Sequence, residues 1–458
     1  MPVAGAWAQA SATACAPAVA RVVSLQGNVE LRRGGGTSWD PVRKLDTPLC
    51  AGDSLRTGNL SRVLLHLQPE TLVRVDQNTV IALKQSGEEI EVEFFAAELA
   101  QALPGARSLG AGYFITRFPK KFKVKTPHVN AAVEGTEFMV ELSRDATKLT
   151  VLEGKVSSQS TVTGDRQLVA AGQSLASGGA GAGTIASVIK PQDAVQWVLR
   201  YPPISDGSGA SRAEELLRAG SVNEALAEVD SVLTGDPGNS DAHALRAIIQ
   251  VAKNDKVGAL ESAAKAATAN ARNYRTWLAM SYAQQARFDL EPALESALKA
   301  ESLQSGSALA HARVAELRLS LGDMRSAEAA ARQAIASDPG ESYAHSVLGF
   351  VHLTQIETQA ARTEFGAAIE RDSFSELSRL GLGLALIREG KLVEGRKQLE
   401  IAVALDPGNS LLRSYVGKAY YEENTAPRDE LATEQFNLAK QLDAQDPTPW
   451  YYEAILKE

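Results

Sequence analysis

The sequence has few cysteines, no long hydrophobic run and no excess of basic residues. Cys15 and Cys50 are the two cysteines among 458 residues, which excludes a disulfide-rich framework. No run of about 18 apolar residues occurs, so we expect no membrane-spanning helix in this chain. The formal net charge of −8 lacks the basic footprint of a nucleic-acid-binding protein.

Motifs of catalysis and cofactor binding are also lacking. The six histidines form no HExxH sequence and no Ser/His/Asp family signature, and no Walker sequence occurs. The glycine-rich stretch 177–184 lacks the lysine of a phosphate-binding loop, so we interpret it as a linker. We therefore predict a protein that is not an enzyme and that needs no cofactor or metal.

The charge is unevenly distributed along the chain. Residues 1–205 hold 21 Lys and Arg against 18 Asp and Glu, which leaves 26 against 37 for the remainder. This change of composition indicates a near-neutral front half and an acidic second half.

A repeated turn organises the second half. The tripeptide Asp-Pro-Gly begins at Asp236, Asp338 and Asp406. The two intervals between these positions are three times and twice 34, and 34 is a period typical of stacked helix pairs. Proline ends a helix, and glycine permits the chain reversal. Small residues recur in the same register, as close packing of two helices requires: Ala225, Ala259, Ala293, Ala327, Ala361 and Gly395.

Residues 206–458 resemble the tetratricopeptide repeat family. The Leu-Gly pair of its first helix occurs at Leu348-Gly349 and Leu382-Gly383, and the aromatic residue of its second helix occurs at Phe365 and Phe436. The resemblance implies an all-α superhelix of about seven repeats with a truncated eighth. We therefore expect this chain to be a fragment of a longer protein.

The resemblance also implies that a protein partner, or a missing C-terminal domain, binds to the concave face. The first helix of each repeat lines this face, and its matching positions give nine predicted contacts: Arg275, Leu278, Tyr282, Tyr343, Phe350, Leu353, Leu380, Leu384 and Ile387. Aromatic residues and Arg commonly anchor interfaces. These residues predict a groove that is more apolar than charged. The alternative is that several of them pack between repeats.

Three histidines occupy equivalent positions in their repeats, namely His243, His311 and His345. A metal site repeated along the array is one interpretation. We favour the other, in which they fill the aromatic packing position of the first helix.

Residues 19–176 are predicted to form an all-β domain, either a sandwich or a β-solenoid. Short runs such as 62–67 and 72–75 are rich in Val and Leu and are separated by turn residues. Lys and apolar residues alternate over 121–125, which predicts a half-buried strand with a basic outer face.

This region resembles FecR-like domains. Gly52-Asp53 with Thr57, Val124 to Pro127, and Val133 to Phe138 match successive family motifs, although Glu134 replaces the usual Arg. The resemblance implies a β fold and a location in the cell envelope. The family's signalling role requires a transmembrane helix and a cytoplasmic segment, so we do not extend it to this chain.

The first residues are small and apolar, and Ala8-Gln9-Ala10 fits an export cleavage site. Export to the periplasm or cell envelope is therefore predicted, and the alternative is that this stretch is a disordered terminus. Cys15 and Cys50 are expected to form one disulfide, with two buried thiols as the alternative. Four segments follow: a residual signal segment and arm (1–18), the FecR-like domain (19–176), a linker with a docking helix (177–205), and the repeat array (206–458). In the docking helix, Trp197, Val198 and Tyr201 form the apolar face.

These features together predict a non-enzymatic envelope scaffold that binds proteins through its repeat groove. The alternative is a module that binds cell-wall glycan within a surface or exopolysaccharide assembly. Its candidate contacts to an anionic polymer are the basic residues Arg117, Lys121, Lys123 and Lys125.

Overall fold

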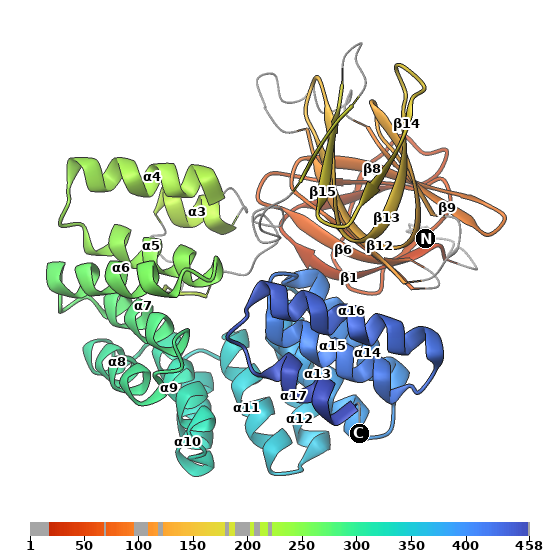
Figure 1. The fold of residues 1–458 in the computed structure, drawn as a ribbon. Helices are drawn as coiled ribbons and strands as arrows, with labels where there is room; N and C mark the ends of the chain where they lie inside the picture. The colour runs from red at the N-terminus through yellow and green to blue at the C-terminus, as the bar shows by residue number, and fades with distance from the viewer. Residues whose placement is uncertain are drawn as a thin grey trace, which may run out of the picture. The chain divides into compact units, whose positions relative to one another are not determined.

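The computed structural model describes residues 18–67, 70–95, 109–117, 122–178, 183–187, 202–205, 211–218 and 222–456, with the backbone alone for residue 134. The chain divides into two compact units, Met1–Ala186 and Ser187–Glu458. The first contains strands and the second contains helices (Figure 1). This confirms the predicted combination of a β domain and a helical array.

The first unit is a sheet of 16 strands with a large apolar core among its described residues. The strands are β1 (Ala20–Gln26), β2 (Val29–Arg32), β3 (Asp40–Pro41), β4 (Pro48–Leu49), β5 (Ser54–Thr57), β6 (Arg62–Leu67), β7 (Thr71–Val75), β8 (Thr79–Ser86), β9 (Glu89–Phe94), β10 (Ala111–Thr116), β11 (Phe122–Lys125), β12 (Val129–Leu142), β13 (Thr147–Ser160), β14 (Arg166–Ala170), β15 (Gln173–Ser177) and β16 (Thr184–Ser187). Their order is β3-β2-β5-β8-β9-β11-β12-β10-β7-β6-β1-β4, and β13 pairs with β12, β14 and β15.

Alternation of apolar and polar residues sets the faces of these strands. In β9 and β11 every second residue is buried, as expected for strands with one face on the core. The rings of Phe114 and Phe138 stack in that core with centroids 4.7 Å apart, and Phe94 and Phe122 pack around Phe114. β16, which pairs with β15, lies inside the stretch that the sequence assigns to a linker, because Thr184 and Ile185 have the β propensity to extend the sheet edge.

The second unit consists of antiparallel helix pairs. Its helices are α3 (Arg212–Arg218), α4 (Val222–Gly235), α5 (Ser240–Ala252), α6 (Lys256–Ala269), α7 (Tyr274–Gln285), α8 (Leu290–Leu303), α9 (Ala308–Ser320), α10 (Met324–Ser337), α11 (Ser342–Thr354), α12 (Thr358–Arg371), α13 (Glu376–Arg388), α14 (Leu392–Leu405), α15 (Ser410–Glu422), α16 (Ala426–Leu442) and α17 (Thr448–Leu456). The starting residues of α5, α7, α9, α11, α13 and α15 follow one another at a constant spacing of 34. The predicted period is therefore confirmed. None of the described helices is both long and apolar enough to cross a membrane.

Capping and small residues explain why the period is so regular. Asn239, Ser307 and Ser375 precede their helices by one residue, and each side chain accepts a hydrogen bond from a backbone N–H in the first turn. The recurring alanines Ala225, Ala259, Ala293, Ala327 and Ala361 are fully buried. A Cβ placed on Gly349 would lie 2.7 Å from Phe365 Cε1, so this glycine lets the ring of α12 approach α11.

A second periodic feature lies at the turn inside each repeat. One residue in each of six consecutive turns has a positive φ, and these residues recur with the period of the helices: Asn254, Phe288, Gly322, Ile356, Gly390 and Asn424. Gly and Asn tolerate this conformation, whereas Phe288 and Ile356 are strained there. Both side chains are exposed, Ile356 by 75%.

The array closes on itself between its second and seventh repeats. Lys256 at the start of α6 lies 2.9 Å from Asp443 at the end of α16, measured from Nζ to Oδ2. Asn254 donates a hydrogen bond of 3.2 Å to the Leu442 carbonyl. The superhelix therefore surrounds an inner space.

Candidate partner-binding cavity

The inner surface of the array contains a cavity of about 540 Å³. On one side it is lined by the C-terminal ends of α5, α7 and α9, which contribute Val251, Tyr282 and Glu316. On the other side it is lined by the turns that precede α11, α13 and α15 and by the end of α16. Residues of six repeats therefore meet in one site, although they are separated by nearly the whole array in the sequence.

The lining combines acidic residues with apolar and aromatic ones. Six carboxylate residues contribute to it, namely Glu316, Glu341, Asp372, Glu376, Asp406 and Asp443, and no Lys, Arg or His is among the described lining residues. Val251, Leu377 and Leu442 supply apolar contacts, and Tyr282 and Tyr343 supply aromatic ones. Because acidic groups focus a negative potential within a concave site, the cavity favours a cationic ligand group.

Two of these carboxylates are held by basic residues from behind the lining. Asp443 pairs with Lys256, and Glu316 pairs with Arg313 of the same helix. The Arg313 side chain is fully buried. Its Nη1 donates to Gln285 Oε1 at 2.7 Å, and its Nε donates to Ser281 Oγ at 2.9 Å. These bonds satisfy the guanidinium without placing a positive charge in the cavity.

The same network fixes the two tyrosines of the lining. The Tyr343 hydroxyl donates a hydrogen bond to Glu316, and the guanidinium carbon of Arg313 lies 3.9 Å from the centre of the Tyr282 ring, a distance suited to a cation–π contact. Since these side chains come from α7, α9 and α11, the network ties three repeats together at the cavity wall.

The network also shifts the protonation equilibria of its members. Burial opposes ionisation of Glu316, but the Arg313 guanidinium and the hydrogen bonds from Tyr343 and Gln285 outweigh it, so the pKa of Glu316 lies below its ordinary value. Burial raises the pKa of Tyr282 to about 12, against the attraction of Arg313. Burial and the nearby Glu316 raise the pKa of Tyr343 well above its ordinary value. Glu316 is therefore charged and both tyrosines are neutral at pH 7.

Two of the nine predicted groove contacts, Tyr282 and Tyr343, line this cavity. Leu278, Leu353 and Leu380 are buried in the array, where they pack as the alternative interpretation expected. The remaining four residues are half-buried: Arg275, Phe350, Leu384 and Ile387. Arg275 lies 3.7 Å from Glu214, and the Phe350 ring packs edge-on against Phe365 with centroids 4.9 Å apart.

The nine groove contacts predicted from the sequence do not include the acidic residues of the cavity, because that prediction favoured apolar residues. Two features of the sequence could have indicated these acidic residues. Asp and Glu are in surplus after residue 205, and Asp372 and Asp406 lie one repeat period apart. The turns that carry them are recognisable in the sequence. Their convergence is not, because it depends on the curvature of the whole superhelix.

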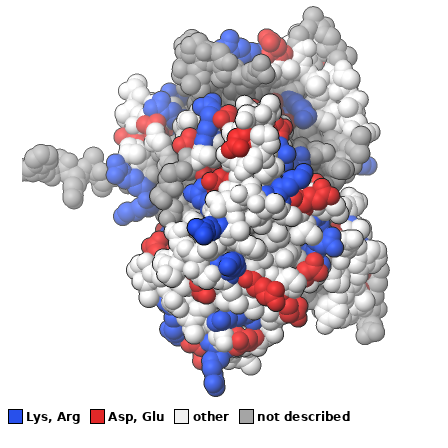
Figure 2. Space-filling view, turned by 90° about the vertical axis from the view of Figure 1, so that its left-hand side faces the viewer, with Lys and Arg blue, Asp and Glu red and all other residues white. Residues whose placement is uncertain are grey.

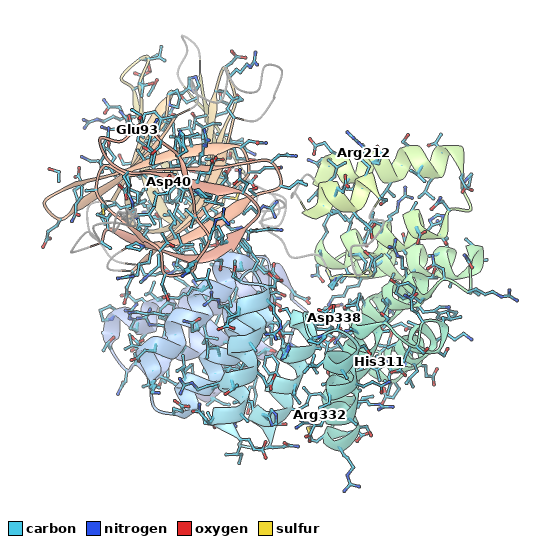
Figure 3. All side chains as sticks on the ribbon, turned by 180° about the vertical axis from the view of Figure 1, so that it is seen from behind. Asp40, Glu93, Arg212, His311, Arg332 and Asp338 are labelled. Atoms are coloured by element: carbon cyan, nitrogen blue, oxygen red, sulfur yellow. The ribbon has the colours of Figure 1, made fainter. Side chains whose placement is uncertain are left out.

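The repeated histidines stabilise turns. His243, His311 and His345 each place Nε2 near the backbone carbonyl oxygen six residues earlier, at 2.9, 2.9 and 3.4 Å. Trp277 donates to the equivalent carbonyl in its own repeat. His311, labelled in Figure 3, also lies 2.7 Å from Glu301 through Nδ1. Among the described residues no three His, Cys, Asp or Glu side chains are grouped in a way that could hold a metal ion.

The basic residues of the β domain differ in their surroundings. Lys123 and Lys125 are partly exposed and pair with Glu89 at 2.8 Å and Glu91 at 2.9 Å, so acidic neighbours on β9 offset the charge of this face. On the same face Lys84 pairs with Glu93, which is labelled in Figure 3. Lys121 lies outside the described residues.

Arg117 does not lie on this face. Its side chain is 2% exposed and pairs with Glu153 at 2.5 Å and with Glu137 at 3.4 Å, while the Tyr113 hydroxyl also donates to Glu137. A polymer outside the domain cannot reach this buried guanidinium, so Arg117 is removed from the candidate contacts. It neutralises two buried carboxylates, and one of them, Glu137, belongs to the FecR-like motif Val133 to Phe138.

The turn that carries Gly52-Asp53 is held by the Asp53 carboxylate, which accepts hydrogen bonds from Arg33, from the backbone N–H of Gly34 and from that of Cys50. Cys50 is disulfide-bonded in the structure. Cys15 lies outside the described residues, so the pairing of these two cysteines stays a prediction. Trp197, Val198 and Tyr201 of the expected docking helix also lie outside them.

Comparison with protein families agrees with both resemblances. The FecR protein family model matches residues 53–157, and a tetratricopeptide repeat model matches residues 211–275, 313–376 and 351–410. Neither of these models describes an enzyme. No curated protein matches the sequence.

Several solved structures have a similar helical array. The Cut9–Hcn1 hetero-tetramer of the APC/C is 13% identical and covers 55% of this chain and 50% of its own, with a TM-score of 0.45. The tetratricopeptide repeat protein TTC0263 of Thermus thermophilus is 18% identical and covers 40% and 100%, with a TM-score of 0.37. The pilF protein of Pseudomonas aeruginosa is 15% identical and covers 47% and 97%, with a TM-score of 0.34. From the two family matches and the helix pairs described above, we conclude that this chain contains a FecR domain followed by an array of tetratricopeptide repeats.

Proposed function

We propose that the chain is an exported, non-enzymatic scaffold of the cell envelope that holds a segment of a protein partner in the inner cavity of its repeat array. The observation that carries this proposal is the cavity of about 540 Å³, to which six repeats contribute lining residues. A site of this size accepts a few large side chains and the backbone between them. Tetratricopeptide repeats support a role in protein–protein interaction, and the FecR family is associated with the bacterial envelope.

One outer face of the molecule carries charged residues of both signs. Basic and acidic residues are interspersed on the face shown in Figure 2, as expected of a solvated surface. No observation on the described residues favours the glycan-binding alternative, since Lys123 and Lys125 are paired with glutamates and Arg117 is buried. We therefore do not propose that alternative.

A capture experiment with matched charge changes tests the proposal. The tagged protein is purified from the envelope fraction of its own cells as wild type, as an Asp372→Lys/Glu376→Lys variant, and as a Glu261→Lys/Glu295→Lys variant. Glu261 and Glu295 are exposed on the second helices of their repeats and do not line the cavity. Both variants carry the same change in net charge.

We expect one protein to be retained by the wild type and the outer-helix variant and to be lost from the cavity variant. Circular dichroism of each variant establishes that the array is folded. Equal retention by all three proteins would contradict the use of the cavity. Recovery of the protein outside the envelope fraction would contradict the proposed location.

A further inference from the structure

The outward side of helix α17 is apolar. Trp450, Tyr451 and Ile455 are 54%, 62% and 47% exposed, and Ala454 beside them is exposed as well. Because helix residues four apart share one face, these four side chains form one stripe, which we call the α17 stripe. The opposite side of α17 packs against α15 and α16. The stripe is therefore the part of this helix that the described residues of the array leave uncovered.

The preceding repeats show what covers this side of a first helix. Trp450 has the register position of Arg413, since each lies four residues after the residue that caps its helix. Arg413 is buried and donates a hydrogen bond of 3.0 Å to Gln435 of α16. One repeat earlier, Arg379 donates a hydrogen bond of 2.9 Å to Gln398 of α14. In both repeats the covering element is an antiparallel helix, so an antiparallel helix is what fits over the α17 stripe.

The stripe is complementary to a second copy of itself. A twofold axis that crosses α17 at right angles through its centre makes the two copies of the helix antiparallel. This axis sets Tyr451 opposite Ala454 of the second copy and Trp450 opposite Ile455 of the second copy. A large ring then faces the smallest side chain of the stripe, and this alternation of large and small residues permits close packing.

The charges around the stripe also suit such a pair. The four residues of the stripe are uncharged, and the charged side chains beside them pair within one copy, Lys440 with Glu453 and Lys418 with Glu422. Lys440 Nζ also lies 4.1 Å from the centre of the Trp450 ring, as in a cation–π contact. Basic and acidic groups thus balance at the rim of the stripe, and two copies meet without a surplus of like charge.

We propose that two copies of this chain associate through their α17 stripes as a twofold, antiparallel helix pair. The four residues of each stripe cover those of the other copy. None of them is among the described lining residues of the cavity, so this association is separate from the proposed capture of a partner and does not depend on it. A contact of this size is smaller than a standard interface. We therefore expect a monomer–dimer equilibrium with a dissociation constant in the micromolar range.

Sedimentation velocity of the chain of 458 residues tests the association across the micromolar range. The wild type is compared with a Tyr451→Glu/Ile455→Glu variant and with a Val257→Glu/Val393→Glu control. Val257 and Val393 lie on α6 and α14 and are exposed by 61% and 45%, nearly as much as the two residues of the stripe. Both variants therefore add the same charge at equally exposed positions, and circular dichroism establishes that each is folded.

We expect the wild type and the control to dimerise with the same dissociation constant and the α17 variant to dimerise at least about tenfold more weakly. A wild type that stays monomeric throughout the micromolar range would overturn the proposal. Equal dissociation constants for the α17 variant and the control would overturn it too.

Crosslinking between copies supplies a second measurement that leaves the stripe apolar. The photoreactive amino acid p-benzoylphenylalanine replaces Tyr451 in unlabelled protein, which is mixed with wild type labelled with nitrogen-15 and then irradiated. We expect tandem mass spectrometry to find adducts with Ala454 or Ile455 of the labelled copy. Adducts within one copy alone, or with labelled peptides outside α17, would overturn the proposal.

Discussion

Lys256 and Asp443 lie 187 residues apart in the sequence, and their side chains form an ion pair of 2.9 Å. The contact joins the turn between α5 and α6 to the end of α16 and so connects the second repeat to the seventh. In an open array these repeats would not meet, because each repeat contacts its neighbours alone. This ion pair therefore lies where the curved array closes around the cavity.

Removal of this ion pair should loosen the closure at little cost in stability. Both side chains are partly shielded, with 14% and 18% exposure, so we expect Lys256→Met to lower the free energy of unfolding by about 1 kcal/mol. Amide hydrogen exchange should accelerate in the turn 253–256 and near Asp443 while other repeats keep their rates. Lys265→Met, on the exposed face of α6, is the control. Unchanged exchange at both turns would show that the ion pair does not hold the closure.

Removal of Arg117 should destabilise the β domain. The substitution Arg117→Ala leaves the buried carboxylates of Glu137 and Glu153 without the guanidinium that pairs with them. Loss of one partner from a buried ion pair costs roughly 3–5 kcal/mol. Denaturant unfolding followed in the β domain measures this loss. Arg144→Ala removes an exposed Arg and should change stability by less than about 0.5 kcal/mol.

The lowered pKa of Glu316 predicts a pH dependence for the array. The ordinary pKa of a Glu carboxyl is 4.5, and the folded state lowers the pKa of Glu316 below it. The charged form of Glu316 therefore stabilises the folded array at pH values above the pKa of the unfolded state. That contribution is lost as the pH falls through the folded pKa. The free energies of unfolding of wild type and Glu316→Gln should therefore differ most at neutral pH and converge in acid. A difference that grows as the solution is acidified would contradict the assignment.

The strained turn at Ile356 predicts a stabilising substitution. A side chain in the left-handed region costs roughly 1–2 kcal/mol. Glycine relieves this strain, but it loses more backbone entropy on folding, which offsets part of the gain. Because Ile356 is largely exposed, Ile356→Gly removes little packing and should raise the free energy of unfolding by roughly 0.5–1 kcal/mol. The reverse change at the equivalent position, Gly322→Ile, should lower it. Thermal unfolding of both variants measures these effects, and a destabilised Ile356→Gly would show that the side chain makes a contact that outweighs the strain.

The sequence predicts the local structure of the array well. Asp236, Asp338 and Asp406 mark turns that are separated by whole periods of the repeat, and the helices begin in that register. Turn and capping residues act on their immediate neighbours, so their effect can be inferred from spacing alone. For the same reason the FecR-like motifs indicate strands that the structure confirms.

The cavity could not be predicted in the same way. Asp372 and Asp443 meet there because small rotations between repeats accumulate over the array, and no single residue encodes that sum. Helical periodicity places Leu278 on the inner helix, yet the side chain is fully buried between neighbouring helices. The charge of Arg117 suggested exposure, whereas Glu137 and Glu153 approach it from a distant hairpin. Such pairings arise from tertiary contacts.

The most direct test of the central claim places a photoreactive crosslinker inside the cavity in living cells. With p-benzoylphenylalanine at Leu377, a lining residue outside the Arg313 network, we expect irradiation to produce adducts with a partner protein. The same crosslinker at Glu295, exposed on α8, should give no such adducts. Adducts with a partner from position 295 and none from position 377 would contradict the account.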